Sequence, residues 1–152
     1  MKRNGAYKQT FMERILGLDV GTKRIGVAIG DDMGIVITGK EAISRKPEHL
    51  ALKRIDEICN EYRIKKIVVG IPYHANGDFG EQAKDCEQFA SLLKDKYDIF
   101  FEDERCSSFE AEENLKNRGV NFRKNKELID IESACIILKQ FINRKRVNYG
   151  RN

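Results

Sequence analysis

The chain has 152 residues, of which 41% are hydrophobic and 34% are charged, and its formal net charge is +4. This length and composition predict one globular domain, and they exclude a disordered chain or two sizeable lobes. No stretch of the sequence is apolar for long enough to span a bilayer, so we expect a cytoplasmic protein without membrane contact.

The first part of the chain predicts three strands in an antiparallel meander. Strands are expected over 14–20, 24–30 and 35–43, because apolar residues run continuously or alternate there. The link Gly21-Thr22-Lys23 is short, which makes the first two strands a hairpin.

The rest of the chain alternates helices with strands. The expected elements are a helix from Pro47 to Tyr62, a strand over 64–71, a helix over 81–94, a strand over 99–103, a helix from Ser107 to near Gly119, and a last helix over 127–143. A meander followed by two crossover units predicts an α/β fold with a mixed five-stranded sheet and helices on both faces. We expect a flexible arm over 1–13, the folded domain over 14–143, and a basic tail over 144–152.

The four cysteines argue against a zinc site or a disulfide framework. They are widely spaced and form no Cys-x-x-Cys pair. Cys59, Cys86 and Cys135 fall on the apolar faces of expected helices, where we interpret them as small core residues.

Three acidic residues occupy positions that ordinary secondary structure explains poorly. Asp19 and Glu104 follow apolar strands, at the carboxyl ends where open α/β sheets place functional groups. Asp130 shares a helix face with Ala134 and Ile137, so it is expected on the core side. Taken singly, a turn-capping role accounts for Asp19 and the helix dipole accounts for Asp130.

Taken together, the three acids predict a metal site. Carboxylates without histidine or cysteine partners are hard oxygen ligands, which favour Mg²⁺ or Mn²⁺. A pair of such ions activates water and stabilises the leaving oxygen in phosphodiester hydrolysis. We therefore predict Asp19, Glu104 and Asp130 as catalytic residues and metal ligands. Asp103 is the less favoured neighbour, because strand alternation sends it to the face opposite Glu104.

Basic residues are concentrated in two segments. They are Lys116, Arg118, Arg123, Lys124 and Lys126 in the first, and Lys139, Arg144, Lys145, Arg146 and Arg151 in the second. Such clusters suggest a polyanionic partner. Solvated loops and termini are also often rich in lysine and arginine, so this observation alone is weak.

Four motifs in this order resemble the YqgF family over residues 14–143. They are LDVGTKRIGVA from Leu18, IVVGIP from Ile67, DERCSSFEA from Asp103, and Asp130 shortly before SACIIL. The family is also known as the RuvX-type Holliday junction resolvases, or pre-16S rRNA nucleases.

The resemblance implies an RNase H-like fold and metal-dependent cleavage of structured nucleic acid. Asp19, Glu104 and Asp130 match the acidic positions of the family, and Thr22, Lys23 and Arg105 would contact phosphates. The expected substrates are the 5′ end of pre-16S rRNA or a Holliday junction. Symmetric cutting of a junction would require a homodimer.

Two interpretations from other functional classes remain open. An ATP-handling domain of the actin and sugar-kinase type also carries an Asp-x-Gly-Thr turn, but it needs two lobes. A non-catalytic nucleic-acid-binding module would keep the fold, but it has no need to gather three acids beside a phosphate.

Overall fold

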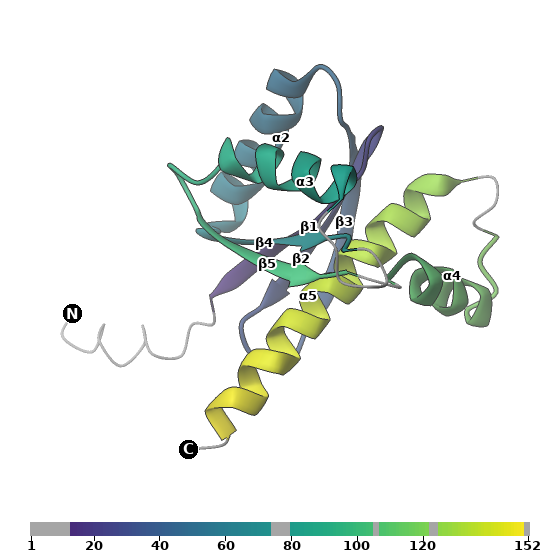
Figure 1. The fold of residues 1–152 in the computed structure, drawn as a ribbon. Coiled ribbons are helices and arrows are strands. Elements are labelled where there is room, and N and C mark those ends of the chain that lie inside the picture. The colour runs from purple at the N-terminus through teal and green to yellow at the C-terminus, as the bar shows by residue number, and fades with distance from the viewer. Residues whose placement is uncertain (1–12, 74–79, 105–106, 122–124, 151–152) are drawn as a thin grey trace.

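A five-stranded mixed sheet forms the centre of the computed structural model, which describes residues 13–73, 80–104, 107–121 and 125–150 (Figure 1). The strands are β1 (Arg14–Val20), β2 (Arg24–Asp31), β3 (Ile37–Ser44), β4 (Lys66–Ile71) and β5 (Asp98–Asp103). Their order across the sheet is β3-β2-β1-β4-β5. The first three strands pair antiparallel, whereas β4 is parallel to β1 and β5 is parallel to β4. The expected meander with two crossovers is confirmed.

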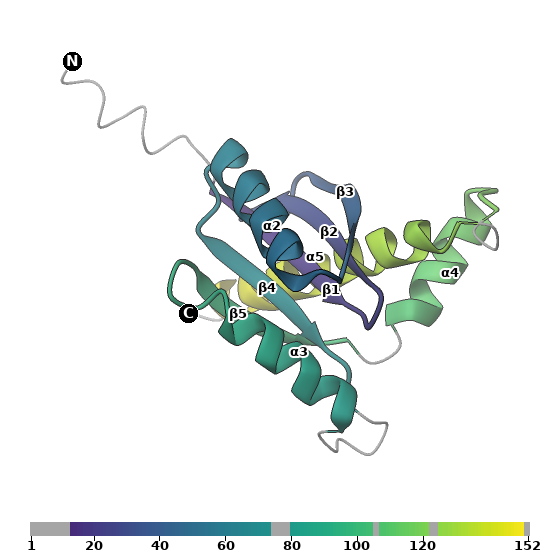
Figure 2. The ribbon, with the colours of Figure 1, turned by 90° about the horizontal axis from the view of Figure 1, so that it is seen from above.

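The described residues form four helices around the sheet. They are α2 (Glu48–Tyr62), α3 (Glu81–Ser91), α4 (Ser107–Asn117) and α5 (Lys126–Gly150). Helices α2 and α3 lie on one face, and the long α5 crosses the other face with α4 packed beside it (Figures 1 and 2).

Strand alternation divides the apolar residues between two cores. On β1, Leu16 and Leu18 belong to the core under α2 and α3, whereas Ile15 belongs to the core under α5. On β4, Val68 likewise faces α5 together with Ile137. Because successive side chains of a strand point to opposite faces, Asp19 follows Ile15 and Gly17 onto the α5 face.

The structure corrects two boundaries that the sequence pattern suggested. The last helix does not end near residue 143 but continues to Gly150, so most of the expected basic tail is helical. The segment has no proline, and its lysine and arginine residues are good helix formers. The third strand begins at Ile37 rather than at residue 35, because Asp31 accepts hydrogen bonds from the backbone N–H groups of Met33, Ile35 and Val36 in a turn.

The predictions for the cysteines and for the glycine after α4 agree with the structure. Cys59 and Cys86 are buried in the core under α2 and α3, while Cys135 is half-buried on α5. Gly119 follows α4 with a φ of 75°, a left-handed conformation that favours glycine at a helix end. Among the described residues, no helix is both long and apolar enough to cross a membrane. Residues 1–12 of the expected 1–13 arm lie outside the described residues, and so does Cys106.

Candidate active site

The three predicted acids come together on the α5 face of the sheet. Asp19 lies near the end of β1, Glu104 directly follows β5, and Asp130 lies near the start of α5. Asp19 forms a hydrogen bond with Glu104 and feels the negative charge of Asp130. Side chains that are far apart in the sequence therefore share one site.

Two glycines allow this close approach. Gly26 is the cross-strand partner of Asp19, and a Cβ atom added to it would lie 1.9 Å from the backbone oxygen of Asp130. A Cβ atom added to Gly70 would lie 3.0 Å from the carboxyl carbon of Glu104. Because these two glycines have no side chains, the backbone of α5 can approach β2, and the Glu104 side chain can lie over β4 beside Asp19. The sequence pattern alone does not reveal this role of the two glycines.

Burial strongly perturbs the first of the three acids. It raises the pKa of Asp19 to about 6 from its ordinary value of 3.8. The hydrogen bond with Glu104 acts in the opposite direction, and the charge of Asp130 adds to the rise. The negative charge at this position is therefore poorly compensated by the protein, which is the electrostatic condition that a bound cation would relieve.

Asp130 is held by an arginine that our sequence analysis did not assign to the site. Arg24 Nε lies 2.6 Å from Asp130 Oδ2, and the two side chains are 31% and 23% exposed. Arg24 opens β2 on the same face as Gly26, and alternation along this strand was the signal that could have placed it beside the acids.

The donor set fits a divalent cation, although it is not preassembled around one. Asp19, Glu104 and Asp130 supply only hard carboxylate oxygens, the ligands that Mg²⁺ and Mn²⁺ prefer. Ser133, one turn beyond Asp130, is fully buried, and its hydroxyl has no hydrogen-bond partner in the described part of the chain. Within those same residues no three acidic, histidine or cysteine side chains lie close enough together to hold a metal ion. Asp130 is paired with Arg24 instead.

The turn after Asp19 carries two of the residues that are predicted to bind phosphate. Thr22 and Lys23 are exposed, and the turn is closed by a hydrogen bond from the backbone N–H of Gly21 to the carbonyl of Arg24, at 2.8 Å. Arg105, the third predicted phosphate ligand, lies outside the described residues.

Arg45 fastens this turn to α3. Its Nη1 donates to the carbonyl of Gly21 at 2.9 Å, and its guanidinium holds Asp85 with two hydrogen bonds of 2.8 and 2.9 Å. The guanidinium also stacks over the ring of Phe89, with 4.9 Å to the centroid. Since the Arg45 side chain is only 9% exposed, this contact is a rigid support for the turn.

The predicted basic segments are partly engaged in ion pairs. Arg118 pairs with Glu132 at 2.9 Å, and Arg144 pairs with the buried Glu102. Lys139 is exposed on α5. Arg123, Lys124 and Arg151 lie outside the described residues.

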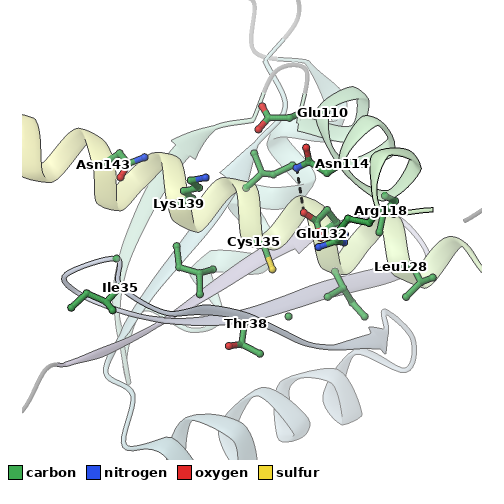
Figure 3. Close-up of a pocket in the computed structure, with 16 residues that line it drawn as sticks. Ile35, Thr38, Glu110, Asn114, Arg118, Leu128, Glu132, Cys135, Lys139 and Asn143 are labelled. Atoms are coloured by element: carbon green, nitrogen blue, oxygen red, sulfur yellow. Dashed lines mark hydrogen bonds and ion pairs between the residues drawn. The ribbon is translucent and has the colours of Figure 1, made fainter. Parts of the chain in front are cut away.

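A separate cavity of about 600 Å³ lies between α4, α5 and the start of β3 (Figure 3). Glu110 of α4 and Arg118, directly after that helix, line it together with Glu132 and Lys139 of α5. None of its described lining residues is one of the three acids, so this cavity and the acidic site are distinct.

Comparison with known proteins decides the family. The model of the RuvX family, described as Holliday junction resolvase, matches residues 13–144. The chain belongs to this family. A relative from Bacillus cereus strain B4264, named "Putative pre-16S rRNA nuclease", is 43% identical over 136 residues, which cover 87% of this chain and 99% of the relative. A relative of the same name from Bacillus mycoides is 41% identical over the same length.

Solved structures confirm the expected RNase H-like class of fold for this RuvX-family chain. The RuvC protein of Thermus thermophilus in complex with a Holliday junction substrate superposes with a TM-score of 0.56 at 13% identity. The match covers 88% of this chain and 96% of that protein. A second RuvC structure from the same organism gives a TM-score of 0.51.

Proposed function

We propose that this protein is a divalent-metal-dependent nuclease that hydrolyses phosphodiester bonds in structured nucleic acid. Membership of a family described as resolvases, with relatives named as nucleases, establishes the enzyme class that the sequence resemblance implied. The meeting of Asp19, Glu104 and Asp130 on one face of the sheet is the observation that supports the mechanism most directly.

In this proposal the three carboxylates hold Mg²⁺ or Mn²⁺. When bound, such ions activate a water molecule and stabilise the leaving oxygen. All three carboxylates would be ionised when they hold the ion, because a ligating carboxylate must be deprotonated. The hydrogen bond between Asp19 and Glu104 needs one proton, so metal binding would release that proton and turn both carboxylates to the ion. Gly26 leaves room for the backbone of Asp130 beside β2.

Polar and basic side chains beside the acids position the sugar–phosphate backbone of the substrate. Thr22 and Lys23 stand exposed beside Asp19, where they can donate hydrogen bonds to a phosphate on the strand being cut. Arg105 would add a further contact. Binding that depends on such phosphate contacts weakens steeply as salt concentration rises, because bound cations are released from the nucleic acid.

The substrate we favour is the 5′ end of pre-16S rRNA, processed in the cytoplasm during ribosome biogenesis. The names of the relatives at 41–43% identity support this choice over a Holliday junction. A Holliday junction is the second candidate, since the family is described as a resolvase and the fold is that of RuvC. Resolution of a junction would require two active sites in a homodimer.

A cleavage assay tests the proposal. The purified protein is incubated with Mg²⁺ or Mn²⁺ and either a labelled precursor rRNA 5′ end or a labelled four-way junction. We expect cleavage of the rRNA, its loss on chelation of the metal, and a rate at least about a hundred-fold lower for Asp19→Asn and Glu104→Gln.

A matched control separates the site from general damage to the fold. Asp103→Asn changes the neighbouring carboxylate on the opposite face of β5, and it should leave the cleavage rate within about two-fold of wild type. Undiminished cleavage by Asp19→Asn would reject the metal mechanism. Binding of both substrates without any cleavage would instead favour the non-catalytic module.

A further inference from the structure

The ion pair between Arg24 and Asp130 carries an inference beyond the nuclease assignment. Arg24 contacts Asp130 through a single described hydrogen bond, from Nε to Oδ2 at 2.6 Å. The pair lies at the edge of the acidic site, with about a third of the arginine side chain exposed. A partly exposed pair with one contact is weak enough to be exchanged for another partner.

A divalent ion on Asp130 and the Arg24 guanidinium compete for the same carboxylate. If both occupied it, two positive groups would lie within a few ångströms of each other, in a site already surrounded by protein. The backbone of Asp130 belongs to α5 and packs closely against Gly26 of β2, whereas the Arg24 side chain is long and about a third exposed. The group that can move is the arginine side chain.

Once released from Asp130, Arg24 would lie next to the turn where a substrate phosphate is expected to bind. Arg24 directly follows Thr22 and Lys23, which form the exposed turn beside Asp19. A guanidinium in this position can bind a phosphate through two parallel hydrogen bonds.

We propose that Arg24 is a positioning residue that exchanges partners. It neutralises Asp130 when no metal is bound, and it turns to a substrate phosphate when a divalent cation takes its place. This inference rests on the proposed metal site. It implies that metal and nucleic acid bind cooperatively, because each favours the state in which Arg24 has left Asp130.

Mn²⁺ titration by calorimetry, without nucleic acid, tests the first half of the exchange. The variants are Arg24→Gln, Arg24→Lys and the control Arg54→Gln, which removes an arginine of similar exposure from an ion pair with Glu41 on the opposite side of the sheet. Arg24→Gln should bind Mn²⁺ about five-fold more tightly than wild type, because the competing cation is gone. Arg54→Gln should match wild type.

Salt dependence of RNA binding tests the second half. The probe is a labelled precursor rRNA 5′ fragment, and gel electrophoresis after each measurement confirms that it is still intact. In Mn²⁺, the slope of log K against log salt should be smaller for Arg24→Gln than for wild type by about 0.7–0.9, the contribution of one phosphate contact. In chelator the two slopes should coincide, because Arg24 is then engaged with Asp130.

The outcomes separate this inference from the nuclease proposal. Mn²⁺ affinity of Arg24→Gln equal to or below that of wild type overturns the exchange, as does a slope difference that persists in chelator. The proposed metal site requires Mn²⁺ binding to wild type that is lost in Asp19→Asn. If no such binding is found, the metal site is rejected, and the exchange is rejected with it. Should Arg24→Gln not fold by circular dichroism, Arg24→Lys serves alone. Its compact ammonium forms a less favourable pair, so tighter Mn²⁺ binding than wild type is again required.

Discussion

Two arginine–aspartate pairs flank the turn after Asp19, and they differ in almost every physical respect. On the α3 side, Arg45 is nearly buried, holds Asp85 with two hydrogen bonds and also donates to the carbonyl of Gly21. On the α5 side, Arg24 is partly exposed and holds Asp130 through one contact. The first pair is built to stay in place, and the second is built to change.

This difference shows how one turn can be both rigid and reactive. Functional groups need support from side chains whose own positions are fixed. Arg45 supplies that support from the α3 side, by donating to the carbonyl of Gly21 in the turn that carries the exposed Thr22 and Lys23. The α5 face carries the carboxylates of Asp19, Glu104 and Asp130. In this account their mutual repulsion is relieved by partners that can exchange, namely Arg24 or a divalent cation.

The largest effect should come from breaking the α5 side at its closest contact. Gly26→Ala places a Cβ atom 1.9 Å from the backbone oxygen of Asp130, and a helix backbone cannot yield locally. We expect a loss of about 3–5 kcal/mol in the free energy of unfolding, measured by urea denaturation. Gly119→Ala, with nothing near its added Cβ but a φ of 75°, should cost only about 1 kcal/mol. Equal effects of the two substitutions would refute the close-packing argument.

The pH dependence of stability should reveal that burial disfavours the ionised form of Asp19. Its folded pKa of about 6 lies above the unfolded value of 3.8, so its ionisation opposes folding increasingly between these values and by a constant amount above them. In metal-free buffer, Asp19→Asn should therefore be more stable than wild type by about 2–3 kcal/mol near pH 8. The difference should nearly vanish near pH 4, and urea denaturation at both values measures it. A variant less stable than wild type at about pH 8 would contradict the assignment.

A smaller loss of stability is expected on the α3 side. Asp85→Asn leaves the guanidinium of Arg45 buried with a weaker partner, which should cost about 2 kcal/mol after allowance for the exposure of Asp85. Arg45 holds the pKa of Asp85 below its usual value, so this contribution is complete above pH 3.8 and is lost as the pH falls through the folded pKa. Thermal melts measure the effect, and Mn²⁺ affinity should not change. A changed Mn²⁺ affinity would show that the two sides are not independent.

The smallest effect sets the scale for a surface ion pair. Glu41 and Arg54 join β3 to α2 at 2.7 Å, and both side chains are about a third exposed. Glu41→Gln should lower the free energy of unfolding by roughly 0.5 kcal/mol, and high salt should abolish the difference. A loss as large as that of Asp85→Asn would mean that burial does not distinguish the two pairs.

The sequence was sufficient to predict the sheet and the proximity of Asp19 and Glu104. Both acids follow from strands whose carboxyl ends were expected at one edge of the sheet, and the structure joins them by a hydrogen bond. Strand alternation favoured Glu104 over Asp103, and Glu104 is the residue that contacts Asp19. These inferences needed only local patterns.

The parts that were not predicted depend on packing between distant elements. Arg24 and Asp130 are 106 positions apart, and their pairing follows from how far α5 slides along the sheet before Gly26 stops it. Arg45 lies at the end of β3 without any motif, and its role exists only because α3 brings Asp85 and Phe89 beside it. The end of α5 was expected too early, near residue 143. The helix continues because the sequence from 144 to 149 carries no residue that terminates a helix.

Anomalous diffraction from crystals soaked in Mn²⁺ tests the central claim most directly. We predict a peak for manganese bounded by the carboxylate oxygens of Asp19, Glu104 and Asp130, with the Arg24 side chain turned away from Asp130. Crystals of Asp19→Asn should lack that peak. Manganese bound elsewhere on the protein, with Arg24 still on Asp130, would contradict this account of the site.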